Sequence, residues 1–269
     1  SIVDGTRSAT ANTETGRRSF NWNETSLSAG LRIPLILTNS KYLRKLSLSS
    51  KSILTSVSGF RLPQDLFIDQ SGNGNLRALE HSIGFVNSLR RSKLDLNSKY
   101  GQSLLLNLKH TPLGGAYHST LIAAESNLYF PGFIKHHSFQ LRGTFQSEDS
   151  KNYYFDSPIR FTRGVGYTPL RYFTNWSINY KMPIWYPDIH IGPLLNIQRV
   201  YINGFYDKGW GRIPGNDRNN ISFKSYGAEI SFNFNLMRYL VLFDVGLRYS
   251  YVPEFKENRT EIIIGAITF

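Results

Sequence analysis

The stretch Ser225–Leu236, "SYGAEISFNFNL", decides the fold class because its side chains alternate in character without interruption. One side carries only apolar residues: Tyr226, Ala228, Ile230, Phe232, Phe234 and Leu236. The other side carries Ser, Gly, Glu and Asn. Successive side chains of a β-strand point to opposite faces, so the pattern predicts a two-faced strand of about twelve residues. Strands in soluble domains usually run only about five or six residues.

The same alternation predicts strands along the whole chain. Residues 26–37, 137–146, 175–182 and 241–251 show it clearly, and residues 43–56, 77–89, 102–110, 119–130, 197–207 and 260–269 show it more weakly. Runs such as "DQSGNGN" and "GRIPGNDRNN" separate about eleven strands in all. We therefore predict one all-β domain over residues 25–269. Residues 1–24 form a polar N-terminal segment that is a strand remnant, a loop or a tail.

The polar sides of these strands indicate whether the interior of the fold is dry or hydrated. The residues that would face the interior of the fold include Gln140, Arg142, Asn179, Lys181, Glu229, Asn233, Asn235, Asp244 and Arg248. A buried charge without a partner costs several kcal/mol, which argues against the dry core of a soluble sandwich. A hydrated barrel interior accepts such residues, and we expect Asp244 and Arg248 to pair within it. The pattern predicts a transmembrane antiparallel β-barrel, with a soluble β-sandwich as the alternative.

Aromatic residues near the ends of the predicted strands support the barrel. Tyr129, Trp185, Tyr186 and Tyr251 are placed there, as in the aromatic belts at the two surfaces of a membrane. No stretch of the chain approaches the ~18 apolar residues that a spanning helix needs. We therefore expect any crossing to be made by strands.

The composition indicates which kinds of partner the chain could bind. The 269 residues include no cysteine and carry a net charge of +12, scattered along the chain. Without a recognition helix or zinc-finger spacing, this charge does not indicate nucleic acid, and anionic lipid headgroups are its more natural partners. No signal-peptide pattern follows Ser1, so we expect that a leader was removed or that the chain begins inside a longer protein.

Catalytic and metal-binding patterns are absent from the sequence. None of the six histidines has a metal-ligand spacing, and His136 and His137 would face opposite ways on a strand. No nucleophile elbow or phosphate-binding glycine loop occurs. We predict no enzyme activity, no metal and no cofactor.

From Arg160 onward the chain resembles a known family. The segments "RFTRGVGY", "NWSINYKMPIWYPD", "RVYINGFYDKGWG", "SYGAEISFNF" and "LFDVGLRYSY" follow one another in that order. This order is similar to the C-terminal barrel of the bacterial surface-antigen superfamily, which includes BamA- and TamA-like outer-membrane proteins. Upstream segments such as "SNLYFPGFIKHHSFQLRGTFQ" resemble the Bacteroidota branch that fuses a TolB-like propeller to this barrel.

The resemblance implies a loop motif folded back into the barrel lumen. Arg163, Gly164 and Tyr167 would be that motif, and Asp207 would be its acidic partner on a later strand. The family places the aromatic residue directly after the glycine, whereas "RGVGY" inserts two residues here. The further lumen-facing residues would be Lys181, Glu229, Asp244 and Arg248.

The last strand, "TEIIIGAITF", ends in an aromatic residue as outer-membrane barrels typically do. We expect Ile263, Gly265, Ile267 and Phe269 to share the lipid face, with Gly265 and Phe269 marking the terminal strand signal. The family barrel has about sixteen strands, so eleven or twelve strands would be its C-terminal part. A complete barrel of about twelve strands is the alternative.

The resemblance implies a function in the bacterial outer membrane without covalent chemistry. A weakly closed seam between the first and last strands would help to assemble or translocate outer-membrane proteins. With a propeller attached, the barrel would instead be a membrane anchor or a subunit of an envelope complex. Its partners would be outer-membrane lipid, lipopolysaccharide, and client proteins or other subunits. The alternative is a passive channel in which Arg142, Lys181 and Arg248 favour anions.

Overall fold

The computed structural model describes residues 2–13, 16–59, 73–92, 94–150, 154–165, 170–192, 194–212, 220–236 and 242–267. These residues form one antiparallel sheet of thirteen strands. The strands are β1 (Ile2–Thr13), β2 (Gly16–Asn39), β3 (Tyr42–Ser58), β4 (Gly74–Leu89), β5 (Gly101–His110), β6 (Ser119–Pro131), β7 (Ser138–Ser150), β8 (Tyr172–Trp185), β9 (Ile189–Ile191), β10 (Leu195–Arg212), β11 (Asn220–Leu236), β12 (Leu242–Val252) and β13 (Glu257–Ile267).

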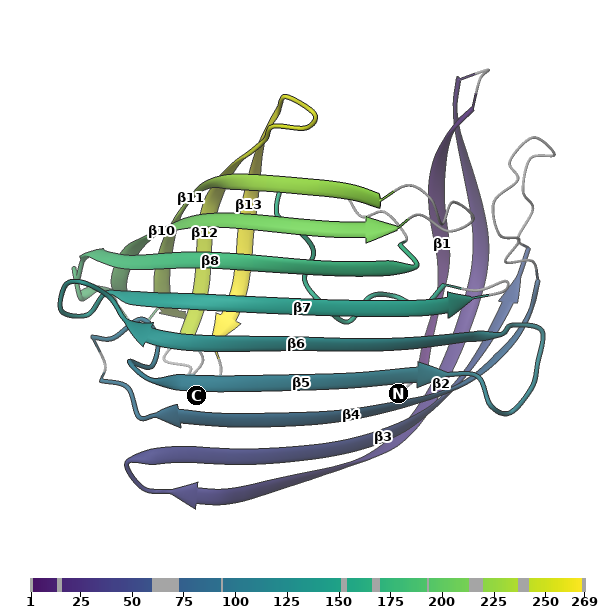
Figure 1. Cartoon of the computed structure of the whole chain (residues 1–269), viewed down its shortest axis with the longest axis horizontal. Coiled ribbons are helices and arrows are strands. Elements are labelled where there is room, and N and C mark those ends of the chain that lie inside the picture. Colours follow the sequence, from purple (N-terminus) through teal and green to yellow (C-terminus); the bar gives the residue numbers. More distant parts are fainter. Residues whose placement is uncertain are drawn as a thin grey trace.

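Each long strand pairs with its neighbours in chain order, and the short β9 pairs only with β10. The sheet curls strongly: β12 and β13 lie behind the front strands, and the hairpin of β1 and β2 rises at the other side (Figure 1). Within the described residues, no pairing joins β1 to β13, so the sheet is open. The all-β prediction is confirmed, whereas closure into a barrel is not seen.

The eleven predicted strands all lie within observed strands or overlap them, and the observed strands are mostly longer. The strand β9 was not predicted, and β1 lies in the N-terminal segment for which a strand remnant, a loop and a tail were left open. The polar residues 2–13 pair along their whole length with residues 16–27, and β2 runs without a break through the boundary predicted at residue 25. Among the described residues, no helix is long and apolar enough to span a membrane.

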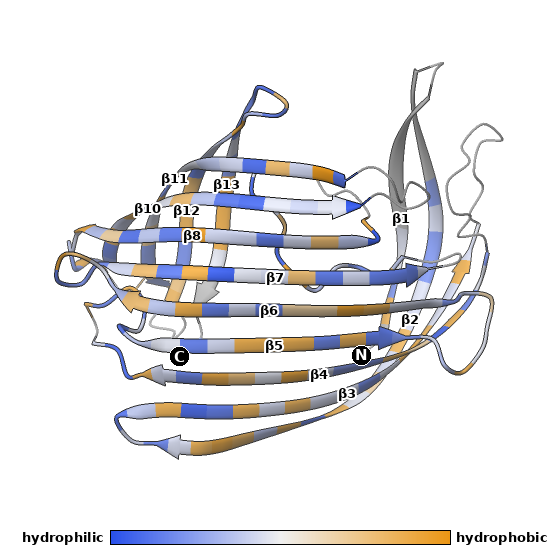
Figure 2. Ribbon diagram, viewed as in Figure 1, coloured by the Kyte–Doolittle hydropathy of each residue, from blue (hydrophilic) through white to orange (hydrophobic). Residues whose placement is uncertain are grey.

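Burial in this sheet is inverted relative to a water-soluble protein. On β11 the polar residues Ser225, Ser231 and Asn233 are at most 2% exposed, whereas the intervening Phe232 is 43% exposed. On β8, Asn175 is fully buried and Trp176 is 59% exposed. The alternation is visible along the strands in Figure 2. We call the face that carries the buried polar residues the inner face, and the opposite, apolar face the outer face.

The inner face also holds one apolar cluster. Phe155 and Ile159, from the segment after β7, pack against Val57 of β3, Leu121 of β6 and Phe173 of β8. All of these residues lie near the end of the sheet where β3 joins β4 and β7 joins β8. The cluster buries apolar area and thereby fastens residues 154–165 against the inner face.

The prediction of which residues of the last strand, β13, face outward is wrong. Register pairs Glu261 with Arg248 and Gly265 with Asp244, which places Ile263 and Gly265 on the inner face. The outer positions are Ile262 and Ile264, which are 72% and 77% exposed. Three consecutive isoleucines leave the alternation ambiguous, so the sequence pattern did not fix the phase.

One belt residue was also misplaced. Tyr129 pairs with Gln140 and lies two positions from Asn127, and both of these residues belong to the inner face. Trp185, at the end of β8, is 57% exposed. Tyr186 is 36% exposed, and its hydroxyl donates to the Leu94 carbonyl at 2.8 Å.

Candidate functional site

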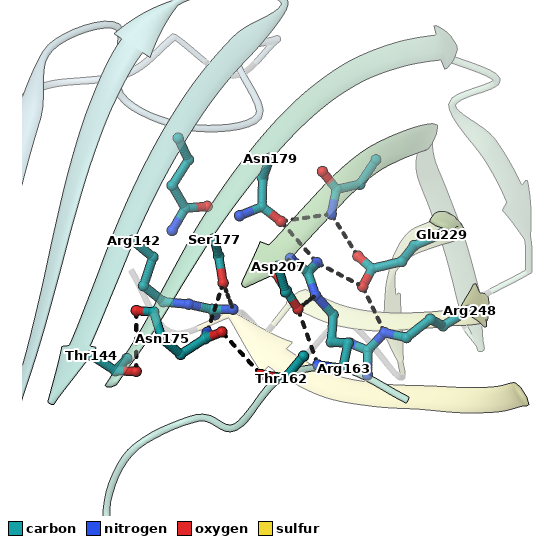
Figure 3. Close-up of polar contacts among 12 residues, drawn as sticks. Arg142, Thr144, Thr162, Arg163, Asn175, Ser177, Asn179, Asp207, Glu229 and Arg248 are labelled. Carbon is teal, nitrogen blue, oxygen red and sulfur yellow. Dashed lines mark hydrogen bonds and ion pairs between the residues drawn. The ribbon is translucent and has the colours of Figure 1, made fainter. Parts of the chain in front are cut away.

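On the inner face, Arg163 forms an ion pair with Asp207 (Figure 3). Arg163 lies on the segment between β7 and β8, and Asp207 lies on β10 and is fully buried. The Arg163 Nε donates to Asp207 Oδ2 at 2.8 Å, and Nη2 donates to Oδ1 at 2.6 Å. The Arg163 main-chain N–H adds a third bond to Oδ2 at 3.0 Å. The structure therefore brings this expected pair together in a bidentate geometry.

Two further strands contact the same guanidinium. Arg163 Nη1 donates to Asn179 Oδ1 of β8 at 2.8 Å and to Glu229 Oε1 of β11 at 3.2 Å. Its Cζ lies 3.8 Å from the ring centroid of Phe205 on β10, within the range of a cation–π contact. One loop residue is therefore held by β8, β10 and β11 together.

The ion pairs continue toward the edge of the sheet. Arg248 of β12 donates from Nε to Glu229 Oε1 at 2.7 Å and from Nη1 to Glu261 Oε2 of β13 at 3.1 Å. Charges thus alternate along Asp207, Arg163, Glu229, Arg248 and Glu261. We call these five residues the charge row. It links the loop to the edge strand β13 through side chains alone.

The charge row keeps Arg163 ionised despite its burial. Burial by itself would lower the pKa of this guanidinium, but the hydrogen bonds and charges of Asp207 and Glu229 raise the pKa above its ordinary value. Buried ion pairs repay their desolvation only when the remaining donors and acceptors are also satisfied. Here Asn203 Nδ2 donates to the second oxygen of Glu229 at 2.7 Å, so both oxygens of that carboxylate are bonded, while the buried Asn203 Oδ1 has no partner among the described residues.

Gly164 allows the loop to reach this position. Its φ of +75° is a left-handed conformation that a residue with a Cβ rarely adopts. A Cβ added there would lie 2.5 Å from Ser250 Oγ on β12. Close approach and backbone conformation therefore both require glycine, next to the arginine that the strands hold.

The other predicted interior residues lie on the inner face, with one change of partner. Asp244 accepts a bond from the Tyr201 hydroxyl at 2.6 Å, and Lys181 Nζ lies 5.6 Å from the Tyr201 ring centroid. The expected pair of Asp244 and Arg248 is wrong. Four residues of extended strand separate them by about 13 Å, whereas Glu229 is directly opposite Arg248 on β11. Tyr167 and Phe269 lie outside the described residues.

Sequence reasoning placed Asn179 in the interior without connecting it to Arg163, and it missed Asn203 and Glu261. Once the strands are in register, Asn203 stands directly opposite Glu229, and Glu261 stands opposite Arg248. The signal that could have found them is the pairing of polar positions on neighbouring strands, which the isolated strand patterns do not give.

The site offers charge and hydrogen bonds rather than reactive groups. Among the described residues, no three potential ligand side chains gather as a metal site would require. The hydrogen bonds and ion pairs of Arg163 hold a loop against the inner face of the sheet. They can break and form again without any covalent change. No protein-family model and no curated protein matches the chain.

Proposed function

We propose that the chain is a β-barrel of the insertase and translocator superfamily in the bacterial outer membrane. The observation that carries the proposal is the inverted burial. Large apolar side chains such as Leu31, Trp176 and Phe232 are 43% to 68% exposed on the outer face, while the inner face buries charge. Exposure to water of so much apolar area would be unfavourable, and a bilayer removes that cost.

The role of such a barrel would be to assemble or translocate outer-membrane proteins, or to serve as an anchor or subunit of an envelope complex. Its exposed edge strands support the first role, because an edge strand presents unpaired N–H and C=O groups to an incoming strand. The net charge of +12 would favour contact with anionic lipid, including lipopolysaccharide. This work needs no covalent chemistry, which agrees with an inner face of ion pairs.

A passive channel is the second candidate, supported by the inner-face cations Arg142, Lys181 and Arg248. The segment 154–165 argues against it, because Phe155, Ile159 and Arg163 are buried against the inner face and occupy the space that a pore would need. A steady large conductance of the intact protein in a planar bilayer would favour the channel.

Membrane insertion is tested by charging the outer face. In a bilayer, Phe232→Arg should destabilise the folded protein by about 2–4 kcal/mol at mid-depth, and the matched Phe232→Leu should cost far less. The measurement is the free energy of unfolding in lipid vesicles. If the outer face meets water instead, Phe232→Arg would leave stability nearly unchanged and improve solubility without detergent, and the proposal would fail.

The assembly role has its own experiment. Vesicles that contain the chain should speed the folding of an unfolded outer-membrane barrel relative to vesicles that contain an Arg163→Ala variant or no protein. Equal rates in all three preparations, with the chain shown to be inserted, would leave only the anchor role.

A further inference from the structure

The inner face is apolar and uncovered at one place, among strands that lie side by side in the lower part of the sheet (Figure 1). Ile36 of β2, Val86 of β4 and Leu105 of β5 are 64%, 37% and 39% exposed there. Register places them on the inner face, because Ile36 and Val86 are both opposite Lys45, and Leu105 is opposite Glu125. Water gains nothing from exposed aliphatic side chains, so a ligand with apolar surface would be stabilised at this place.

These three residues line a groove that crosses the inner face from β2 to β6. Its volume is about 480 Å³, within the range of about 300–1,000 Å³ that small-molecule sites occupy. Ser47 and Gly84 line its middle. They are directly opposite each other on β3 and β4, and their small side chains leave the space between the apolar residues open. The groove therefore has the size and shape for a slender ligand.

The two ends of the groove differ in charge. Arg32 and Lys45 line the end formed by β2 and β3, and both are exposed. Neither side chain has a hydrogen bond or an ion pair within the part of the chain that the structure describes. Glu125 lines the end formed by β6, where its Oε1 accepts a bond from Asn127 Nδ2 at 3.3 Å. An anionic group is therefore attracted to the β2–β3 end and repelled from the β6 end.

Charge and apolar surface together define the class of ligand. An inorganic anion would leave Val86 and Leu105 uncovered, and an uncharged alkane would leave Arg32 and Lys45 without a counter-ion. A carboxylate on an alkyl chain satisfies both, because a guanidinium can bind a carboxylate through two N–H groups. The methylene groups of Lys45 can pack along an alkyl chain while its ammonium group reaches the carboxylate.

We propose that the groove binds a long-chain fatty acid, with its carboxylate at Arg32 and Lys45 and its alkyl chain along Val86 and Leu105. Binding of such a ligand goes beyond the proposed function. The groove lies on the inner face, so the site does not depend on what the outer face meets.

Photo-cross-linking tests the site. Palmitate with a diazirine group near its methyl end is equilibrated with the protein in lipid vesicles and irradiated, and mass spectrometry of the digest locates the adducts. We expect adducts on Val86 or Leu105. Excess unlabelled palmitate should prevent them, whereas palmitate methyl ester, which has no charge, should not. Arg32→Gln combined with Lys45→Gln should lower this labelling about fivefold, because the anion loses both cations.

Two neighbouring leucines provide a matched control for the apolar part of the site. Leu104 and Leu105 are 40% and 39% exposed, but successive residues of a strand lie on opposite faces. Leu105→Ala should raise the palmitate concentration needed for half-maximal competition by about fivefold, and Leu104→Ala should leave it unchanged. Neither substitution changes a charge, and circular dichroism confirms that both variants retain the sheet.

Adducts confined to outer-face residues such as Leu104 would overturn the proposal, because palmitate would then contact the protein only as a component of the bilayer. Equal competition by the methyl ester, or equal shifts for the two leucine variants, would also overturn it. If Phe232→Arg shows that the outer face meets water, the same labelling is carried out in buffer without vesicles or detergent. The fatty-acid site and the membrane proposal therefore fail separately.

Discussion

Strands β11 and β2 follow the same alternating pattern, yet their inner faces differ. On β11 the inner residues Ser225 and Asn233 are fully buried. On the C-terminal half of β2 the inner residues Gly30, Arg32 and Pro34 are exposed, and Ile36 is 64% exposed. The outer faces are alike, because Phe232 of β11 and Leu31 of β2 are both exposed.

The difference teaches that alternation places a side chain on a face but does not determine what that face meets. Next to β11, the loop residue Arg163 and the side chains of the neighbouring strands cover the inner face. Next to the C-terminal half of β2, the described residues leave the inner face bare. Stability of the folded chain should therefore depend on inner residues in the β10–β12 region and hardly at all on those of the C-terminal half of β2.

The largest effect is expected from Arg163→Ala. Asp207 and Glu229 would remain buried without their cation, and the free energy of unfolding should fall by about 3–5 kcal/mol. Arg163→Lys should recover only part of the loss because an ammonium group cannot make the bidentate contact. Denaturant titration in lipid vesicles measures both, and a loss below about 1 kcal/mol for Arg163→Ala would contradict the assigned role.

A smaller loss is expected from Gly164→Ala. The left-handed φ should cost about 1–2 kcal/mol, and the overlap with Ser250 should add about 1–3 kcal/mol. Gly59→Ala is the matched control, because Gly59 has a φ of +73° but nothing within 4 Å of an added Cβ. The same titration should give the larger loss for Gly164→Ala; equal losses would mean that the loop does not press against β12.

Glu261→Gln should have a modest effect. The carboxylate is 39% exposed and shares Arg248 with the better buried Glu229, so solvent screening limits the loss to about 0.5–1 kcal/mol. Hydrogen exchange of β13 amides should nonetheless rise, since the charge row would lose its contact with the edge strand. Unchanged exchange would show that backbone pairing alone holds β13.

The smallest effect is expected from Arg32→Ala on the bare inner face of β2. Stability should stay within about 0.5 kcal/mol of the wild type, as for most exposed positions. A loss comparable to that of Arg163→Ala would mean that the inner face of β2 is covered in solution, and the contrast between the two regions would disappear.

The strand pattern was predictable because alternation is a local property. In residues 225–236 and in residues 26–37, the alternation within the segment assigns each side chain to a face, and no information about neighbouring strands is needed. The segment of β1 was left open between a strand remnant, a loop and a tail because it and its partner, the start of β2, are both polar, so neither shows an apolar side that would identify a strand. The phase of β13 was missed because Ile262, Ile263 and Ile264 are equivalent in hydropathy, and only the ion pair of Glu261 separates the faces.

The site was predictable only in part. The resemblance pointed to Arg163 and Asp207, which the structure brings together, but it gave no place for Asn203 or Glu261. These residues join through strand register, which depends on the turns and pairing of the whole sheet. For the same reason the contacts of residues 94–97 were not foreseen: nothing in "LDLN" indicates that Tyr186 and Arg199 donate to its main-chain carbonyls.

The charge row also has a consequence for the order of folding. Arg163 lies 44 residues before Asp207 and 66 residues before Glu229, so its ion-pair partners lie on strands that come later in the sequence. Contacts between such distant residues form slowly, since long loops must close first. We expect the loop to dock as one of the last events, after β10 and β11 have paired. Pulse labelling during refolding would show this as late protection of the Arg163 amide, well after the amides of β7 and β8.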